Sequence, residues 1–343
     1  MKKYLLREDL PYFKGNLHCH STLSDGRRTP EELKEIYKAK GYSILAYTDH
    51  DIFLPHEDLA EENFLPLHGF EMEITEEGEK AWHRKQTCHI CLIALEKDMR
   101  LQPMWHRSEY LFGNAPQYRD QVQFDENQPD YIRHYDGEHI SEIMREGREK
   151  GFFVTYNHPS WSKEYYPQYS GYEGMHAFEI MNGACCQEGY DDYNPRVYDD
   201  FLYQGKRIYC IGADDNHNFF PVDHCRNDSG LAFTMIQAER LDYRRVTRAL
   251  EEGNFYASQG PEIHALWLEE GKVHIRCSQA ERIYYHTAAR RGEVAYPGEA
   301  GGILTAASFP VEMDHGWFRL EVRDEKGLHA CTNAYFTDEV LKD

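Results

Sequence analysis

The sequence predicts an α/β fold followed by a smaller all-β region. Helix and strand patterns alternate up to about residue 260, and polar residues of metal-ligand type follow the apolar strand segments. Residues 261–343 instead contain short segments in which apolar and polar residues alternate. Alternating helices and strands favour a parallel barrel or a doubly wound sheet, in which side chains from many strands meet at one face. The barrel is preferred because the ligand-type residues come from so many strands.

Size and charge limit the classes of function. The chain has 343 residues, of which 41% are apolar, enough for a large α/β domain and a small second one. Its 38 Lys and Arg residues against 59 Asp and Glu residues give a formal net charge of −21. We therefore expect a long nucleic acid to be repelled by most of the surface. No segment approaches the ~18 consecutive apolar residues of a membrane span, so we expect no membrane partner.

The nine cysteines are scattered, and the first residues lack the apolar stretch of a signal peptide. Reduced thiols and a cytoplasmic location are therefore expected. Cys88 and Cys91 form a CxxC pair around His89, but the sequence has no second CxxC to complete a structural zinc site.

The first helix is marked by its N-terminal signals. Thr29 is placed as the N-cap, a proline follows at the first helical position, and Glu32 is placed to close a capping box. We expect this helix to stop at Gly41. The apolar run 42–47 then predicts a buried strand that delivers His50 at its carboxyl end.

The same unit returns twice. Helices are predicted over 139–150 and 197–204, with strands over 152–156 and 208–212. A helix over 243–252 closes the first domain near Gly260.

Two further regions depart from this pattern. Residues 96–137 show no clear period, and a long irregular insertion after a ligand strand is more typical of a lid or binding loop than of a linker. After residue 260, strands are predicted over 263–268, 273–277, 282–286, 317–322 and 329–336, with a hairpin turn at 324–327. We therefore expect two domains, 1–260 and 261–343, the second being a β-sandwich-like accessory domain.

Ligand-type residues occur in the ordered segments HCHSTLSD, YTDHD, GFE, CHI, NHP and DDNH. In an extended strand His18 and His20 point to the same side. Imidazole and carboxylate suit zinc, manganese or iron, whereas calcium and magnesium prefer oxygen ligands. Each pair alone is weak, but the series indicates one site built from many strand ends. The candidate metal ligands are His18, His20, Asp25, His50, Glu71, His89, His158, Asp215 and His217.

These motifs resemble those of the PHP (polymerase and histidinol phosphatase) domain family, over roughly residues 14–260. The matching segments are HCHSTLSDG (18–26), YTDHD (47–51), GFE (69–71), CHI (88–90), NHP (157–159) and DNH (215–217). The resemblance implies a distorted seven-stranded β/α barrel with up to three metals at its C-terminal rim. It would place one metal on His18, His20, Glu71 and Asp215, a second on Glu71, His89 and His158, and a third on Asp25, His50 and His217.

Such a site suits a phosphoester. Three carboxylates contribute about −3 and three divalent ions about +6, which leaves a local excess that attracts a phosphate dianion. A bound metal lowers the pKa of water from ~15.7 to ~7, and two metals ~3.5–4 Å apart can clamp the reacting oxygens. With two to three zinc, manganese or iron ions, we predict hydrolysis of a small phosphorylated metabolite such as a nucleotide or sugar phosphate. The predicted catalytic residues are Asp25, His50, Glu71 and His217.

Several neighbouring residues are open to a second interpretation. Asp214 competes with Asp215 for one ligand position, and the spacing to His217 favours Asp215. Glu73 shares a strand face with Glu71, and the preceding glycine favours Glu71. Asp49 and Asp51 are expected either to bond the backbone or to orient the ligands. Glu179 and Asn182 either orient the ligands or form a solvated strand end.

Substrate contacts are predicted at the rim. Arg27 and Arg28 follow Asp25, where a guanidinium binds phosphate as a fork or forms a solvated loop pair. The aromatic stretch 161–172 either stacks a base or packs under the insertion.

Two other functions stay open at this level. One is a non-catalytic, metal-stabilised binding or regulatory module whose β domain recruits a partner. The other is a nuclease for short oligonucleotides. The sequence assigns no protein partner.

Overall fold

The structure, a computed structural model, describes residues 2–298 and 302–342. The strands are β1 (Lys3–Leu6), β2 (Tyr12–Asn16), β3 (Ile44–Tyr47), β4 (Leu65–Thr75), β5 (Thr87–Ala94), β6 (Phe152–Tyr156), β7 (Ala177–Asn182), β8 (Tyr209–Ala213), β9 (Phe233–Gln237), β10 (Phe255–Ser258), β11 (Ile263–Glu269), β12 (Lys272–Ala280), β13 (Arg282–Thr287), β14 (Glu293–Ala295), β15 (Leu304–Pro310), β16 (Trp317–Arg323), β17 (His329–Thr332) and β18 (Tyr335–Phe336).

The α-helices are α1 (Pro30–Ala39), α2 (Gly137–Glu149), α3 (Pro159–Ser162), α4 (Tyr166–Tyr169), α5 (Gly183–Glu188), α6 (Pro195–Tyr203), α7 (Tyr243–Glu252) and α8 (Thr337–Val340). Short 3₁₀ helices are η1 (Glu57–Leu59), η2 (Trp82–Arg84), η3 (Ala115–Gln121) and η4 (Met313–His315).

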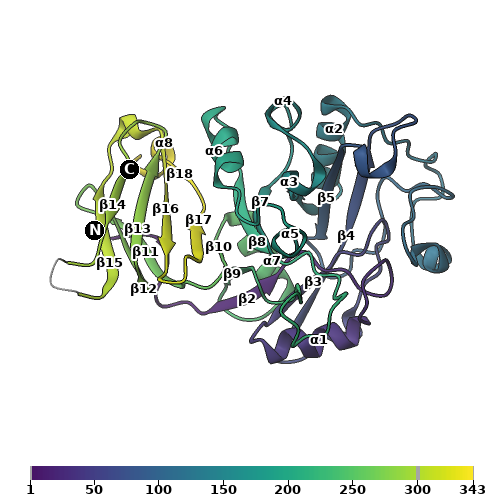
Figure 1. Cartoon of the computed structure of the whole chain (residues 1–343), viewed down its shortest axis with the longest axis horizontal. Coiled ribbons are helices and arrows are strands. Elements are labelled where there is room, and N and C mark those ends of the chain that lie inside the picture. The colour runs from purple at the N-terminus through teal and green to yellow at the C-terminus, as the bar shows by residue number, and fades with distance from the viewer. Residues whose placement is uncertain (1, 299–301, 343) are drawn as a thin grey trace.

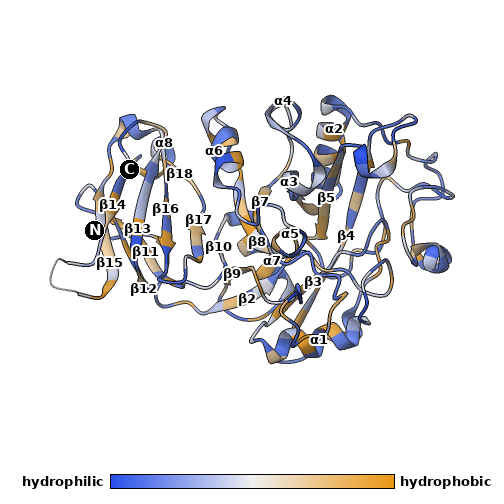
Figure 2. Cartoon of the chain, viewed as in Figure 1, coloured by the Kyte–Doolittle hydropathy of each residue, from blue (hydrophilic) through white to orange (hydrophobic). Residues whose placement is uncertain are grey.

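A long mixed sheet runs through the molecule (Figure 1). Its strand order is β14-β13-β16-β17-β10-β9-β2-β3-β4-β5-β6-β7-β8, with β18 paired to β16, and a separate sheet has the order β1-β11-β12-β15. Hydrophobic residues concentrate on β5, β7 and β8, while the outer loops are hydrophilic (Figure 2). The expectation of a mixed α/β fold with an all-β region is therefore confirmed.

Local signals set the helix boundaries. The capping box at α1 is present: the Glu32 backbone N–H donates to the Thr29 hydroxyl (3.3 Å), and the Thr29 N–H donates to the Glu32 carboxylate (3.0 Å). The aspartates before α2 and α7 accept from the third helical N–H in the same way. The observed α7 and β6 have the predicted bounds.

The expectation of an all-parallel arrangement is wrong at β5. This strand is antiparallel to both β4 and β6, because β4 and β5 form a long hairpin. Its reversal brings the beginning of β5, rather than its end, to the ligand rim. His89 is accordingly the third residue of its strand, and Glu71 lies in the middle of β4 instead of at its end.

The strands β2 to β8 are seven neighbours in the sheet order. Just beyond β2 and β8, Cys19 and Asn216 form an isolated parallel bridge. The His20 N–H donates to the Asn216 carbonyl (3.1 Å), and the Asp215 N–H donates to the His18 carbonyl (3.0 Å). These bonds join the two ends of the series at the ligand rim. Among the described strands β8 and β2 are not paired with each other, so a closed seven-stranded barrel is not confirmed.

The C-terminal region consists of two layers with one core. One hydrophobic cluster, which includes Leu266, Ile275 and Phe318, is shared by two sheets. One is the separate sheet β1-β11-β12-β15, and the other is the part of the long sheet in which β13 pairs with β16. The first strand of the chain, β1, belongs to this region because it pairs with β11. The N-terminus accordingly lies beside β14 and β15 in the view of Figure 1. A domain boundary at residue 260 stays a prediction.

The insertion 96–137 has a core of its own. Trp105, Ala115 and Val122 form a buried cluster with Ile52, which follows the second ligand motif. The buried Arg133 pairs with Asp51 at the end of the insertion. The insertion is therefore anchored to the ligand rim.

No helix in the described part of the chain combines the length and apolar character needed to cross a membrane.

Candidate metal centre

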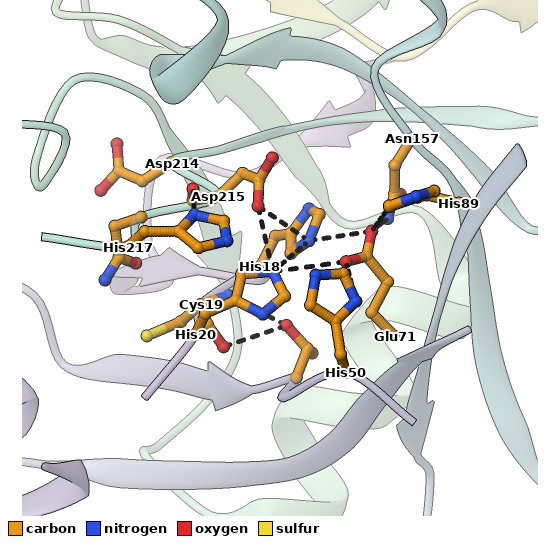
Figure 3. A network of polar contacts seen from close by, with 12 residues as sticks. His18, Cys19, His20, His50, Glu71, His89, Asn157, Asp214, Asp215 and His217 are labelled. Atoms are coloured by element: carbon orange, nitrogen blue, oxygen red, sulfur yellow. Dashed lines mark hydrogen bonds and ion pairs between the residues drawn. The ribbon is translucent and has the colours of Figure 1, made fainter. Parts of the chain in front are cut away.

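All nine predicted ligand residues meet in one polar cluster, and most of them are labelled in Figure 3. Their ligand atoms form three overlapping groups, within each of which all atoms lie within 4.8 Å of one another. The groups are His20, Asp25, His50 and His217; His18, Glu71, His158 and Asp215; and His50, Glu71 and His89. Within these groups, Asp25 lies beside His217 and Glu71 beside His158, although these residues are far apart in the sequence.

Glu71 is the centre of the cluster. It is buried, and five imidazoles surround its carboxylate. Its Oε1 lies 3.1 Å from His18 Nε2, 3.2 Å from His89 Nδ1 and 3.3 Å from His158 Nε2, and its Oε2 lies 3.3 Å from both His20 Nε2 and His50 Nδ1. Because imidazole nitrogens lie beside both oxygens of Glu71, each oxygen would be available to a cation that these nitrogens also bind.

Asp215 forms the second contact point. Its Oδ1 lies 3.2 Å from His18 Nε2 and 3.1 Å from His20 Nε2, and its Oδ2 lies 3.6 Å from His158 Nε2. Asp215 and His158 both have positive φ angles, 53° and 23°. Such backbone conformations cost free energy in residues other than glycine and often occur where a side chain must point in a functional direction.

Asp25 and His217 form the outer edge of the cluster. Asp25 Oδ2 lies 3.2 Å from His217 Nε2, and both side chains are partly exposed. The His20 ring stacks against both His50 and His217, and each of their ring centroids lies 4.4 Å from that of His20. The outer edge is therefore the part that a substrate can reach.

Buried polar residues hold the ligands in place. Glu179 accepts from His18 Nδ1 (2.9 Å), from the His158 N–H (3.2 Å) and from the Asn182 amide (2.8 Å). Because Glu179 contacts Nδ1 of His18, the Nε2 atom of that ring faces Glu71 and Asp215.

Asp49 and Asp214 support the surrounding loops instead. Asp49 accepts from the backbone and hydroxyl groups of Ser21 and Ser24. Asp214 accepts from the Tyr37 hydroxyl and from three backbone N–H groups at residues 230–232, and its carboxylate lies apart from the imidazoles (Figure 3). The carboxylate of Asp214 is thus used by Tyr37 of α1 and by the backbone at residues 230–232, which leaves Asp215 for the cluster.

Nearby carboxylates raise the pKa of several imidazoles in the cluster. Burial lowers the pKa of His18 and His20, but Asp215 and Glu71 outweigh it and hold both pKa values well above 6.5. Glu71 in the same way raises the pKa of His89 to about 9. Burial and the neighbouring His20 lower the pKa of His50 to about 4, so this imidazole is neutral. Protons therefore hold positions that cations can take.

The donor set fits divalent cations. Within the described residues, four buried cluster atoms have no hydrogen-bond partner: His20 Nδ1, His50 Nδ1, His89 Nε2 and Glu71 Oε2. Unpaired buried polar atoms are costly, by about 1–3 kcal/mol each. His50 Nδ1 and Glu71 Oε2 face each other at 3.3 Å, and cations bound at the cluster would supply the partner that each atom lacks.

A cavity of about 340 Å³ adjoins the cluster. Seven of the nine ligand residues line it, namely Asp25, His50, Glu71, His89, His158, Asp215 and His217. The other lining residues include Trp82, Lys85, Phe112, Trp161, Lys163, Tyr190 and Phe219. Sequence reasoning missed both lysines, because nothing in their local pattern places them near the ligands. It did identify Trp161 as a candidate for stacking.

Arg27 and Arg28 do not line this cavity among the residues described. The Arg27 guanidinium lies 4.9 Å from the ring centroid of Phe219, which does line it, and Arg28 lies 3.7 Å from Glu32. Their role as phosphate contacts stays a prediction.

Replacing Glu179 by glutamine is expected to weaken metal binding about 10- to 100-fold while the fold is kept, as for other residues that orient metal ligands. The amide can still accept from His18 but loses the charge that favours a fixed proton on Nδ1. Chelator competition on the purified protein measures the affinity. Glu188→Gln is the matched control, because Glu188 accepts from Trp161 at 2.8 Å and touches none of the nine ligands. Equal affinities for the two variants would remove this role from Glu179.

Comparisons with known proteins find three solved structures that are similar to this chain and one curated protein with a local sequence match. No protein-family model matches the chain. The DNA polymerase/3′-5′ exonuclease PolX of Bacillus subtilis is 36% identical over an 88-residue alignment that covers 20% of this chain and 15% of that protein. The chain thus corresponds to a small part of this curated relative.

The solved structures are similar over longer stretches at low identity. A two-domain protein from Bacteroides vulgatus containing a predicted PHP-like metal-dependent phosphoesterase is 17% identical, with 96% of this chain and 98% of that chain covered and a TM-score of 0.43. A proposed metal-dependent phosphoesterase from Bifidobacterium adolescentis is 16% identical, covering 61% and 89%, with a TM-score of 0.36. An amidohydrolase from Chromobacterium violaceum, solved with bound sulfate and no metal, is 16% identical, covering 59% and 87%, with a TM-score of 0.34.

All three neighbours carry names of hydrolases, and all three TM-scores lie below 0.5. The description of the Bacteroides vulgatus protein names a PHP-like metal-dependent phosphoesterase, and that of the Bifidobacterium adolescentis protein names a metal-dependent phosphoesterase.

Proposed function

We propose that the protein is a metal-dependent phosphoesterase that hydrolyses a small phosphorylated metabolite, such as a nucleotide or sugar phosphate. The observation that carries the proposal is the cluster itself, in which one buried carboxylate lies within 3.3 Å of five imidazoles beside an open cavity. A purely structural polar cluster would satisfy its buried atoms internally, whereas four atoms here lack a partner among the described residues.

The cluster has donors for two to three divalent ions, with zinc, manganese and iron as candidates. His18, His20, Glu71 and Asp215 would hold one ion, and His89 and His158 would share Glu71 for a second. Asp25, His50 and His217 would hold a third at the outer edge. When bound, such ions supply an activated water and a clamp for phosphoryl oxygens.

The residues of the chain supply position and access. Glu179 fixes the direction of His18, and the insertion closes one side of the cavity through Phe112, whose ring centroid lies 5.5 Å from that of His50. Asp25 and His217 lie at the open edge, where a phosphate would arrive. Arg27 stands near this edge and is the nearer of the two predicted phosphate contacts to a cavity wall.

The test is a hydrolysis assay on protein purified without a metal-affinity tag. After elemental analysis, the protein is loaded separately with zinc, manganese and iron and assayed with 4-nitrophenyl phosphate and a panel of metabolite phosphomonoesters. We expect metal-dependent release of phosphate that is lost in a His50→Ala variant. Tight metal binding with no turnover of any member of the panel would instead favour the non-catalytic binding module.

Metal binding is expected to strengthen as pH rises. Each coordinating imidazole must lose its proton, and the raised pKa values, about 9 for His89, make protons strong competitors at neutral pH. In the metal-free protein, the raised histidine pKa values stabilise the fold fully below pH 6.5, and this contribution is lost as pH rises through about 9. The difference in melting temperature between metal-loaded and metal-free protein should therefore widen from pH 6.5 to 9. A difference that is constant or shrinks over this range contradicts the assignment.

The local similarity to a DNA polymerase/3′-5′ exonuclease favours a second candidate, cleavage of phosphodiesters in short oligonucleotides. The net charge of −21 disfavours a long nucleic acid, although a few nucleotides would fit beside the aromatic cavity walls. Adding a labelled di- and trinucleotide to the same panel separates the two candidates.

A further inference from the structure

Two lysines form one arm of the cavity beside the cluster. Lys85 precedes β5 and is half-buried, and Lys163 follows α3 at the mouth. Among the residues the structure describes, neither ammonium group takes part in an ion pair, whereas the nearby Lys80 pairs with Glu76 at 2.7 Å. Lys85 and Lys163 line the cavity together with the carboxylates of Glu73 and Glu188, and two ammonium groups without an ion pair there would attract an anionic ligand.

The structure holds these two lysines on linked segments. The Gln86 side-chain amide donates to the Lys163 carbonyl at 2.7 Å, which joins the loop before β5 to the loop after α3. Lys163 itself has a φ of 63°, in the left-handed region that residues other than glycine seldom adopt. Its ammonium lies 4.0 Å from the ring centroid of Tyr190, a third element of the same wall. The arm is therefore built from three segments.

Aromatic rings connect this arm to the cluster. The Trp161 ring centroid lies 5.3 Å from that of His89 and 5.5 Å from that of His158. The ring centroid of Trp82 lies 6.3 Å from that of Trp161, and Trp82 is three residues before Lys85 in the sequence. If the phosphate of a substrate lies at the cluster, the apolar part next to it would thus pack on Trp161, and a group beyond that part would reach the lysines.

We infer that Lys85 and Lys163 form a subsite for a second anionic group of the substrate. This group belongs to the alcohol that hydrolysis releases from the phosphate. This inference rests on the proposed function. The recognised chemistry is a carboxylate or a further phosphate, separated from the scissile phosphoester by a spacer that packs on Trp161. The subsite selects among phosphoesters and takes no part in bond breaking, so it acts on KM rather than on kcat.

The experiment uses metal-loaded protein and three matched esters: 4-carboxyphenyl phosphate, 1,4-phenylene bisphosphate and the neutral isostere 4-carbamoylphenyl phosphate. We expect the wild type to show a KM about five- to tenfold lower for at least one of the two esters with an anionic tail than for the carbamoyl ester, a preference that salt reduces. In the Lys85→Gln/Lys163→Gln double variant the preference should vanish with kcat unchanged. Lys80→Gln is the matched control and should behave as the wild type. The ester that shows the preference identifies the anion as carboxylate or phosphate.

Binding of 4-carboxybenzylphosphonate against its carbamoyl counterpart, measured by titration calorimetry, tests the subsite without turnover. Tighter binding of the carboxylate by the wild type, but not by the double variant, supports the subsite even if no ester is hydrolysed, in which case only the proposed function fails. Hydrolysis of all esters with no anion preference in either measurement overturns the subsite alone. A preference that survives in the double variant also overturns it.

Discussion

Replacing Glu71 by glutamine is expected to remove phosphoesterase activity, with kcat/KM falling by more than about a hundredfold. Changes to residues that only orient metal ligands cost 10- to 100-fold, and Glu71 is itself the carboxylate that five imidazoles surround. An amide cannot bridge two cations through two anionic oxygens, so the number of metal ions bound per chain should also fall. Elemental analysis and the hydrolysis assay measure the two effects.

Glu73→Gln is the control for this experiment. Glu73 lies on the same face of β4 and lines the same cavity, but it belongs to none of the three ligand groups. It should keep its metal content and most of its kcat. Loss of metal in Glu73→Gln with retention in Glu71→Gln would mean that the ligand is the later glutamate, and full activity of both variants would contradict the proposed metal centre.

Replacing Arg319 by alanine is expected to lower the free energy of unfolding by about 3–5 kcal/mol, the usual cost of removing one partner of a buried ion pair. The Arg319 side chain on β16 is 1% exposed, and its guanidinium makes two bonds to Asp199 on α6, at 2.8 and 3.0 Å. It also lies 3.3 Å from Glu321. The pair thus joins the C-terminal region to a helix of the α/β region. Urea unfolding followed by circular dichroism gives the free energy.

Arg7→Ala provides the matched comparison. Arg7 forms the same two-bond contact with Asp9, at 2.9 and 2.6 Å, but both side chains are more than half exposed. Its removal should change stability little, because solvent screens such pairs. If Arg319→Ala does not fold, Arg319→Lys, which keeps the charge and loses the fork, should give an intermediate loss. Equal effects of Arg319→Ala and Arg7→Ala would show that the buried pair does not join the two regions.

Local signals explain what the sequence could predict. The caps of α1 and α7 are encoded within a few residues, and the apolar run before His50 marks a buried strand wherever it lies. The nine ligand-type residues could be listed because each follows or occupies such a segment. The choice of Asp215 over Asp214 followed from spacing, and the contacts of Asp214 within its turn agree with it.

Direction and long-range placement could not be predicted in the same way. A buried strand has the same apolar pattern whether it runs up or down, so the reversal of β5 left no local signal. The pairing of β1 with β11 joins residues about 260 positions apart, and the approach of Lys85 to Lys163 depends on the hydrogen bond from Gln86. These features arise only when the whole sheet has formed.

The β4–β5 hairpin has a consequence for how the protein can diversify. Its two strands carry Glu71 and His89, and the connection between them, residues 76–86, carries Trp82 and Lys85. The strands are locked by continuous pairing from Gly69 with Ile93 to Thr75 with Thr87, so the connection can lengthen or change composition without shifting either ligand. Relatives that share the cations but accept different alcohols would therefore be expected to differ most at this connection, and exchanging it would be the most direct route to a new specificity.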